Sequence, residues 1–231
     1  MARECQQDPM LTRKVFRFSP PPEHTARRLF VFLHGSGATA QSMMSVAFRF
    51  QARFPSAALV VPSGFDAFEA DGAGQQWFSM RGLNDDNRLQ RVEAVLPRLE
   101  DLVRREQANC GVPAERTVLI GFSQGGTLAL EAVKMLPWLS GAVVAYSARF
   151  ARLPQRGTGI RARIHLVHGE YDAIVSRVHS ERAARVLSAL HVPVTLDIVG
   201  DLGHALTHHA ISIGSLRLLQ GIFEGRKATL H

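Results

Sequence analysis

Apolar and polar positions fall into alternating blocks along the chain, and these blocks predict strands and helices in turn. Several short segments are near-continuous apolar runs, such as Leu29–Leu33, which is typical of strands covered on both faces. Seven segments with this strand-like character are predicted to form a sheet. They are Lys14–Ser19, Arg28–Leu33, Ala57–Val61, Thr117–Ile120, Gly141–Ala145, Arg163–Val167 and Val194–Val199.

The longest helical pattern runs from Asp86 to Gln107, where leucine and valine recur at three- and four-residue spacing. It ends at Cys110–Pro113, where glycine followed by proline is a helix stop signal. Strands that alternate with helices predict an α/β fold with an open, mostly parallel sheet and helices on both faces. The other predicted helices are Ala40–Ala52, Gln124–Met135, Arg177–Leu190 and His208–Glu224.

Length and composition indicate a single domain spanning residues 1–231, with residues 1–12 as a flexible N-terminal tail. No apolar run approaches the roughly 20 residues that cross a bilayer, and Met1–Asp8 lacks the apolar core of a signal peptide. The two cysteines, Cys5 and Cys110, form no disulfide framework and no metal cluster. We therefore expect a cytoplasmic protein with no stable membrane insertion.

The net charge of +7 comes mainly from arginines that are scattered along the chain. No basic tract interleaved with aromatic residues appears, so nucleic acid is not an expected partner. One cluster gathers around a single connection, and it could favour anionic substrates or membrane headgroups, or be a solvated basic loop. Its members are Arg149, Arg152, Arg156, Arg161 and Arg163.

The segment Gly121–Gly125 fits the pattern Gly-x-Ser-x-Gly, with Ser123 at its centre. A bare five-residue match is weak, but here a predicted strand precedes it and a predicted helix follows it. A serine at such a strand-to-helix turn sits in a sharp bend that lifts its hydroxyl above the sheet edge. This context favours a nucleophile over an ordinary turn serine.

A serine nucleophile needs a histidine to accept its proton, and that histidine needs a carboxylate to orient it. Active sites of such sheets gather at the carboxyl ends of the strands. His204 follows the predicted strand Val194–Val199 through a short loop at that end, so it is the predicted base. Asp172 leaves the predicted strand Arg163–Val167 at the same end and is the predicted acid, with Glu170 as its nearest competitor.

Acyl transfer also needs two N–H donors where negative charge develops. The backbone N–H of Gln124, which follows the nucleophile at a helix start, is the first predicted donor. The glycine-rich segment His34–Gly37 follows an early strand, so the Ser36 backbone is the second. This segment lacks the Gly-Lys-Ser/Thr of a phosphate loop. His204–His209 lacks the His-Glu-x-x-His pattern, so no metal site is predicted.

The segment Ser63–Asp85 follows a strand and shows no clear periodicity, which is uncommon in a compact domain unless it is functional. Its aromatic and apolar content fits either the wall of an acyl pocket or a plug on the core. Trp77 is the residue most expected to border the site. The residues predicted to line the pocket are Phe65, Trp77, Phe78 and Met80.

Together these motifs resemble the carboxylesterase, phospholipase and acyl-protein thioesterase family of α/β-hydrolases, over nearly the whole chain. Within that family, Gln76–Ser79 and Asp85–Arg88 are similar to small bacterial esterases of the YpfH type. The segments that carry the family resemblance are Phe32–Gly37, Gln76–Phe78, Gly121–Gly126, His168–Asp172 and Gly203–His204.

The resemblance implies an α/β-hydrolase fold without a large cap domain and a triad of Ser123, His204 and Asp172. It also implies that the N–H groups of Ser36 and Gln124 form the oxyanion hole. The implied activity is hydrolysis of short- to medium-chain acyl esters through an acyl-enzyme, without a cofactor, with a homodimer as an option. One departure is Ser36, since thioesterase members carry Leu-Gly after His-Gly.

Three functions remain open at this point. The first is a serine carboxylesterase acting on a small-molecule acyl ester. The second is a lysophospholipase or acyl-protein thioesterase, for which the basic cluster and the aromatic segment would hold headgroup and chain. The third is a hydrolase-like binding protein without turnover, against which the complete set of Ser, His and Asp argues.

Overall fold

The computed structural model describes residues 14–21, 23–70 and 72–228, and the predicted tail 1–12 with Cys5 lies outside them. A seven-stranded sheet forms its centre, in the order β1-β3-β2-β6-β7-β8-β9. β1 runs antiparallel to β3, and the other neighbouring pairs are parallel. The strands of this sheet are β1 (Val15–Phe18), β2 (Arg28–Leu33), β3 (Ala57–Pro62), β6 (Thr117–Phe122), β7 (Ala142–Tyr146), β8 (Arg163–Gly169) and β9 (Val194–Val199).

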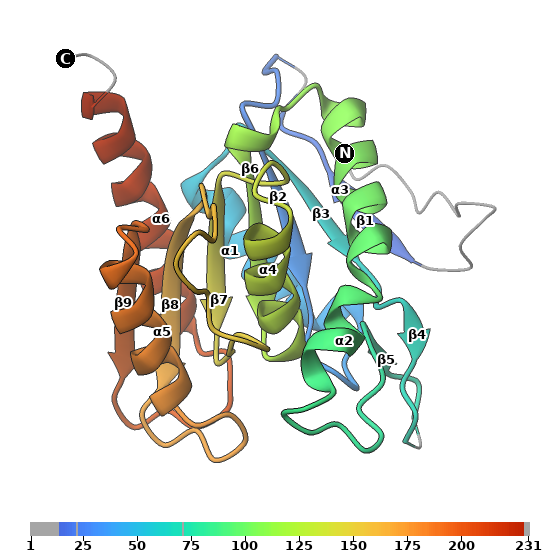
Figure 1. The fold of residues 1–231 in the computed structure, drawn as a ribbon. Coiled ribbons are helices and arrows are strands. Elements are labelled where there is room, and N and C mark those ends of the chain that lie inside the picture. Colours follow the sequence, from blue (N-terminus) through green and yellow to red (C-terminus); the bar gives the residue numbers. More distant parts are fainter. Residues whose placement is uncertain (1–13, 22, 71, 229–231) are drawn as a thin grey trace.

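Helices cover both faces of this sheet, as predicted (Figure 1). Helices α3, α4 and α5 lie on one face, and α1 and α6 lie on the other. The helices are α1 (Met44–Arg53), α2 (Arg88–Glu93), α3 (Leu96–Cys110), α4 (Gln124–Met135), α5 (Val178–Ala189) and α6 (His208–Ala228). Two short 3-10 turns, η1 (Ala40–Met43) and η2 (Ala114–Arg116), precede α1 and β6.

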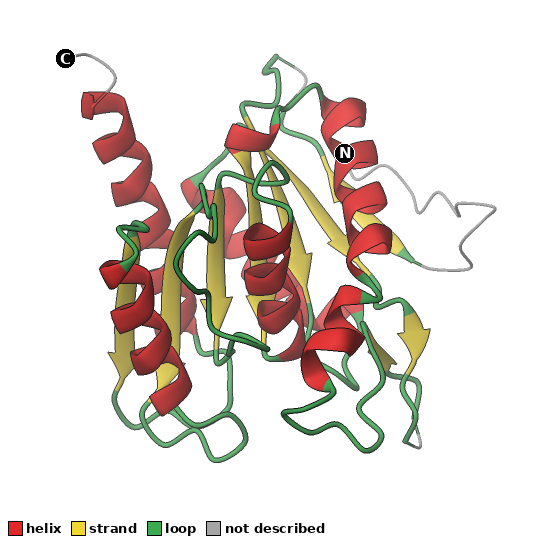
Figure 2. Cartoon of the chain, viewed as in Figure 1, coloured by secondary structure: helices red, strands yellow, loops and turns green. Residues whose placement is uncertain are grey.

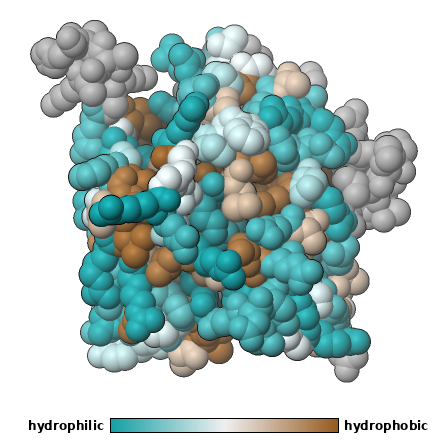
Figure 3. Space-filling view, viewed as in Figure 1, coloured by the Kyte–Doolittle hydropathy of each residue, from teal (hydrophilic) through white to brown (hydrophobic). Residues whose placement is uncertain are grey.

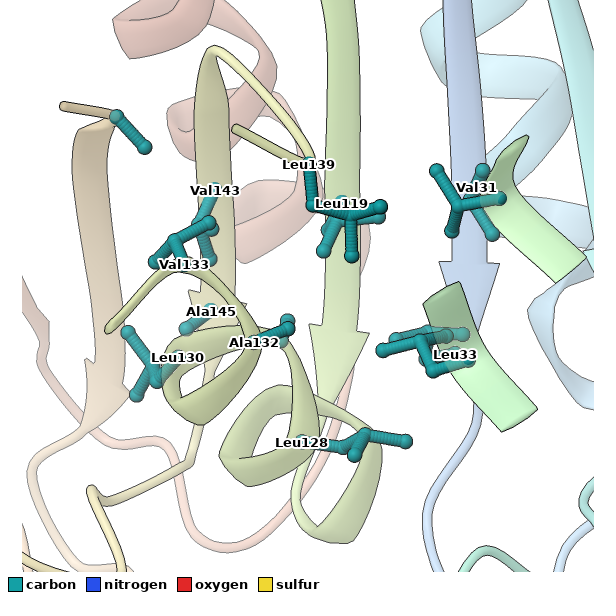
Figure 4. Packing of buried hydrophobic residues seen from close by; sticks show 14 of the residues in the cluster. Val31, Leu33, Leu119, Leu128, Leu130, Ala132, Val133, Leu139, Val143 and Ala145 are labelled. Atoms are coloured by element: carbon teal, nitrogen blue, oxygen red, sulfur yellow. The ribbon is translucent and has the colours of Figure 1, made fainter. Parts of the chain in front are cut away.

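Alternating side chains of β2 explain why its sequence is apolar throughout. Leu29, Val31 and Leu33 pack on the side of α3 and α4, whereas Phe30 and Phe32 pack on the side of α1. A strand buried on both faces has no polar face to show, because successive side chains point to opposite sides. Figure 4 shows the first of these layers, where Leu33 of β2 lies near Leu128 of α4.

The helix predicted over Asp86–Gln107 is in fact two helices, α2 and α3, and this prediction was wrong in that respect. The break lies at Ala94 and Val95, three and two residues before Pro97. Proline has no N–H to bond the carbonyl of Glu93, and its ring crowds that carbonyl, so the helix must end and restart. The leucine and valine periodicity continues across the break and hides it.

Other boundaries also differ from the prediction, and two of them lie at the site. β6 continues through Phe122, directly to the nucleophile candidate, and β8 continues through Gly169, so His168 belongs to a strand rather than to a loop. The segment after β3 contains a small antiparallel ribbon of β4 (Asp66–Ala67) and β5 (Gln75–Gln76). Strands of two residues are too short to show an alternating pattern.

The carboxyl ends of the parallel strands meet at one edge of the sheet, the lower edge in Figures 1 and 2. The loops after β6, β8 and β9 gather there, together with the β4–β5 segment. On the face that carries α3, α4 and α5, polar residues divide the apolar surface into separate patches (Figure 3). Among the described helices, none has the length and apolar character to cross a membrane.

Candidate active site

Ser123 occupies the turn between β6 and α4 in a conformation that few residues adopt. Its φ is 52° and its ψ is −114°, outside the ordinary helical and extended regions. The turn is held by hydrogen bonds from the Ser123 N–H to the Tyr146 carbonyl at 3.0 Å and from the Thr127 N–H to the Ser123 carbonyl at 2.9 Å. Strain of this kind costs about 1–3 kcal/mol and persists where the surroundings enforce it.

Close backbone packing explains the glycines on either side of Ser123. A Cβ atom on Gly121 would overlap the backbone of Gly125, one turn further along the chain. A Cβ atom on Gly125 would overlap the carbonyl groups of Leu33 and His34. The first turn of α4 can therefore lie directly on the loop after β2, which brings Gln124 beside the glycine-rich segment.

The structure brings Ser123, His204 and Asp172 together from three separate strand ends. The Ser123 Oγ atom lies 3.0 Å from His204 Nε2, and His204 Nδ1 lies 2.8 Å from Asp172 Oδ2. Since a carboxylate only accepts hydrogen bonds, Nδ1 carries the proton and Nε2 is free to accept one from the serine hydroxyl. The ring of Phe122 packs against that of His204, with ring centroids 4.8 Å apart.

Asp172 is a buried carboxylate whose oxygens are both satisfied. Oδ1 accepts the N–H groups of Ile174 at 3.0 Å and Val175 at 2.8 Å, while Oδ2 faces His204. Burial by itself would raise the pKa of Asp172, but the hydrogen bonds from Val175, His204 and Ile174 outweigh it and lower the pKa. Asp172 therefore stays ionised, as a group that orients an imidazole must.

His168 is a contact of Asp172 to which the sequence interpretation assigned no role. Its Nε2 atom lies 2.7 Å from the Val175 carbonyl and 3.3 Å from Asp172 Oδ2, and its Nδ1 lies 2.7 Å from Ser180 Oγ. Burial lowers the pKa of His168, so the ring stays neutral and Nε2–H donates toward the carbonyl. His168 thus fixes the loop in which Asp172 lies.

The two predicted N–H donors have no acceptor among the described residues. Neither the Ser36 N–H nor the Gln124 N–H donates a hydrogen bond within that part of the chain. The loop that carries Ser36 lies against the nucleophile turn, since a Cβ atom on Gly35 would be 3.5 Å from the Ser123 Cβ. Unpaired N–H groups beside a serine hydroxyl suit an oxygen that gains negative charge.

His34 keeps the glycine-rich loop in place, a role that the sequence did not reveal. Its Nδ1–H donates to the Gly35 carbonyl at 2.7 Å, and the Gly64 N–H donates to its Nε2 at 2.8 Å. Burial lowers the pKa of His34, against the opposing effect of the Gly35 carbonyl, so the ring stays neutral. A histidine followed by glycine directly after a strand was the available signal.

Trp77 is completely buried, with none of its surface exposed to solvent. Its indole N–H donates to the His34 carbonyl at 2.8 Å, and its backbone N–H donates to Gln124 Oε1 at 2.8 Å. The Gln124 Nε2 atom in turn donates to the Phe78 carbonyl at 2.7 Å. Trp77 therefore contacts both of the segments that carry the predicted N–H donors, and it stabilises them. Because it is fully buried, it does not line a pocket.

The other predicted pocket residues divide in the same way. Phe65 and Phe78 are buried, and Phe65 packs edge-on against Trp77 with ring centroids 5.1 Å apart. Met80 is exposed. The structure thus places three of the four residues inside the core. An acyl pocket lined by all four remains a prediction.

The arginines of the predicted basic cluster have different surroundings. Arg152, Arg156 and Arg161 are exposed, and Arg163 in β8 pairs with Glu224 of α6 at 3.0 Å. Arg149 differs, because it is largely buried and turns toward the segment that precedes α2. The cluster in the sequence thus separates into solvated arginines and one arginine near the carboxyl edge of the sheet.

Comparisons with known proteins identify the family of the chain. The family model described as Phospholipase/Carboxylesterase matches residues 19–213. The chain is 39% identical over 190 residues to Esterase YpfH of Escherichia coli strain K12, covering 82% of this chain and 81% of that protein. It is 30% identical to Acyl-protein thioesterase 1 of Saccharomyces cerevisiae over 168 residues, covering 65% of this chain and 72% of the yeast protein.

Solved structures share the fold. The crystal structure of esterase PE8 superposes with a TM-score of 0.81 at 24% identity, covering 88% of this chain and 96% of that one. A carboxylesterase from Mesorhizobium loti superposes with a TM-score of 0.77 at 17% identity, covering 94% and 99%. The predicted fold class and the predicted family resemblance are confirmed.

Proposed function

Because the chain belongs to the phospholipase/carboxylesterase family of α/β-hydrolases, we propose that it hydrolyses short- to medium-chain acyl esters by serine catalysis. It shares its family with proteins named esterase and acyl-protein thioesterase. The observation that carries the proposal is the hydrogen-bonded chain from Ser123 through His204 to Asp172. The Ser36 and Gln124 N–H groups beside it support the same reaction.

In the proposed reaction, Ser123 Oγ attacks the acyl carbonyl while His204 Nε2 takes the hydroxyl proton. Asp172 holds His204 in the tautomer that can do so and stabilises the imidazolium that forms. The carbonyl oxygen becomes negative and is bound by the N–H groups of Ser36 and Gln124. The alcohol leaves with the proton from His204, and water activated by the same histidine then releases the acid and restores Ser123.

A second candidate is a lysophospholipase or acyl-protein thioesterase. Tyr171 and Ile174, on either side of Asp172, are exposed over 65% and 74% of their surfaces. Apolar side chains at the rim would suit a longer acyl chain. If the enzyme preferred substrates with long acyl chains, this second function would be favoured over a carboxylesterase. The proposed roles of Ser123, His204 and Asp172 would stay the same.

The test is a panel of p-nitrophenyl esters and acyl thioesters of increasing chain length, measured with wild type and with Ser123→Ala. Short and medium esters should be the best substrates, and Ser123→Ala should lose activity by several orders of magnitude. Retention of more than about a tenth of the activity in Ser123→Ala would refute the serine mechanism. A strong preference for thioesters of 12 to 16 carbons would refute the carboxylesterase assignment alone.

A further inference from the structure

Two arginines from distant parts of the sequence meet at one carboxylate oxygen. Arg149 Nη1 lies 3.1 Å from Asp85 Oδ1, and Arg88 Nη2 lies 3.6 Å from the same atom. Arg88 is the first residue of α2, whereas Arg149 lies on the loop after β7. The two guanidinium groups are therefore neighbours, with one carboxylate between them.

This pair lies at the same edge of the sheet as Ser123. β7 ends at Tyr146, whose carbonyl accepts the Ser123 N–H at 3.0 Å, and the loop begins at the next residue. Ala148 packs on the first turn of α4, so closely that a Cβ atom on Gly126 would be 2.6 Å from the Ala148 Cβ. Arg149 follows directly. Helix α2 also packs against α4, and its first residue, Arg88, therefore lies near Arg149.

The loop that carries Arg149 is held in place by the buried ion pair of Glu131 and Lys134 in α4. Glu131 Oε1 accepts the N–H groups of Ala151 at 2.7 Å and Arg152 at 3.2 Å. Lys134 pairs with Glu131 and donates to the Arg152 carbonyl at 2.7 Å. The position of Arg149 is consequently set by the fold, as a specific binding group requires.

Within the part of the chain that the structure describes, the two guanidinium groups share a single carboxylate. The side chains of Arg88 and Arg149 are only 18% and 20% exposed, whereas the one carboxylate between them, on Asp85, is 72% exposed and screened by water. The Nε atom of Arg88 is buried without an acceptor. Burial, followed by the charge of Arg149, lowers the pKa of Arg88. Burial, followed by the charge of Arg149, also lowers the pKa of His179, with smaller contributions from Arg182 and Arg88.

We propose that Arg88 and Arg149 form a subsite for an anionic group, a carboxylate or a phosphate, carried by the ester substrate. This inference rests on the proposed function and names the substrate class of that site. The anion would replace or share Asp85 as the partner of Arg88 Nη2 and Arg149 Nη1, the atoms that face its carboxylate. Guanidinium groups bind such oxygens with two parallel hydrogen bonds, which gives direction as well as charge.

Matched esters test the proposal on both sides of the reacting bond. The acyl arm compares p-nitrophenyl butyrate with the mono-p-nitrophenyl ester of glutaric acid, and the alcohol arm compares methyl 4-acetoxybenzoate with 4-acetoxybenzoate. The measured quantity is the ratio of kcat/KM for the anionic ester to that for its neutral partner. The proteins are wild type, Arg88→Gln, Arg149→Gln, the double variant, and Arg156→Gln as an exposed arginine control.

In one arm at least, the ratio should fall about tenfold or more in the double variant, mainly through KM, and should stay near wild type in Arg156→Gln. Arg149→Lys should give a ratio between those of Arg149→Gln and wild type, because lysine keeps the positive charge. The arm that responds tells whether the anion is on the acyl or the alcohol part. A ratio within twofold of wild type in both arms would overturn the proposal.

A second measurement guards against a variant that does not fold. Inorganic phosphate should inhibit wild type and Arg156→Gln competitively and to the same extent, and it should inhibit Arg88→Gln and Arg149→Gln more weakly. No inhibition of wild type, or equal inhibition of wild type and the folded single variants, would overturn the proposal. Failure of the proposed function has a different signature, because wild type would then hydrolyse neither ester of a pair, or Ser123→Ala would retain activity toward both.

Discussion

The indole N–H of Trp77 donates a hydrogen bond of 2.8 Å to the carbonyl oxygen of His34, in the interior of the protein. Through this bond the segment after β3 holds the loop after β2, which carries Ser36. The backbone N–H of Trp77 also binds the Gln124 side chain. One buried residue thus connects the two segments whose N–H groups would bind the developing oxyanion.

Replacing Trp77 by phenylalanine removes the indole donor and leaves the His34 carbonyl buried without a partner. We expect a loss of about 1–3 kcal/mol in the free energy of unfolding, measured by urea denaturation. We also expect kcat to fall about tenfold with little change in KM, because the substrate is bound but the oxyanion donors shift.

Trp138→Phe is the matched control, since Trp138 is 51% exposed and its indole N–H donates to Glu100, which is partly exposed. Its effect on unfolding should stay within about 0.5 kcal/mol, with kcat unchanged. Equal effects of the two tryptophan substitutions on kcat would show that Trp77 does not support the site.

Asp172→Asn preserves the shape of the side chain but removes its charge. The amide no longer selects the His204 tautomer with a proton on Nδ1, and it cannot stabilise the imidazolium. We expect kcat to fall about 10³- to 10⁴-fold while KM changes little. Asp201→Asn, an exposed aspartate close to His204 in the sequence, should remain within twofold of wild type. A severe loss in Asp201→Asn with a mild one in Asp172→Asn would reverse the assignment of the acid.

Much of this site follows from the order of strands and loops. In a parallel sheet every strand end reaches the same edge, so Ser123, His204 and Asp172 could be chosen from residues that directly follow strands. The supporting residues could not be chosen this way. Trp77 lies in a segment without periodicity, and His168 looks like a loop residue because β8 is longer than its apolar run.

The fold was predictable to the same extent. Apolar runs located the five central strands β2, β3, β6, β7 and β8, because almost all of their side chains are buried. The edge strands β1 and β9 were located as well, although their side chains are mostly only partly buried. The break between α2 and α3 was missed, since periodicity reports the buried face of a helix and not the backbone N–H that Pro97 lacks. Arg149 was noted only as part of a basic cluster, because pairing with Asp85 depends on tertiary contacts.

The buried pair of Glu131 and Lys134 should be essential as a pair. Glu131→Ala leaves the Lys134 ammonium buried without a counter-ion and two N–H groups without an acceptor. We expect the free energy of unfolding to drop by about 3–5 kcal/mol in urea titrations. The double variant Glu131→Leu/Lys134→Met should recover a large part of this loss. If the double variant is no more stable than Glu131→Ala, the unpaired Lys134 ammonium is not the cause of the lost stability.

His165 makes stability depend on pH in the acid range. Burial, followed by the charges of Arg163 and Arg217, lowers its pKa to about 4 from an ordinary value of 6.5, and Asp197 partly opposes this. The folded state therefore binds a proton less readily than the unfolded chain. Its contribution to the free energy of unfolding is complete above pH 6.5 and is lost as the pH falls toward 4, by about 2 kcal/mol at pH 5.

Urea titrations at pH 7 and pH 5 measure this contribution directly. The difference in unfolding free energy between the two pH values should be smaller by about 2 kcal/mol in His165→Gln than in wild type. His209→Gln, an exposed histidine, should leave that difference unchanged. An unaltered difference in His165→Gln would place the acid sensitivity in other groups.

Covalent labelling by a fluorophosphonate tests the central claim, that Ser123 is a nucleophile activated by His204. The serine oxygen attacks phosphorus, fluoride leaves, and the adduct stays bound, so the reaction reports activation without any choice of substrate. Mass spectrometry of the folded wild type should find one adduct, on Ser123, with no label on Ser123→Ala and far slower labelling of His204→Ala. Folded wild type that takes no label, or Ser123→Ala that is labelled at the wild-type rate, would contradict the account.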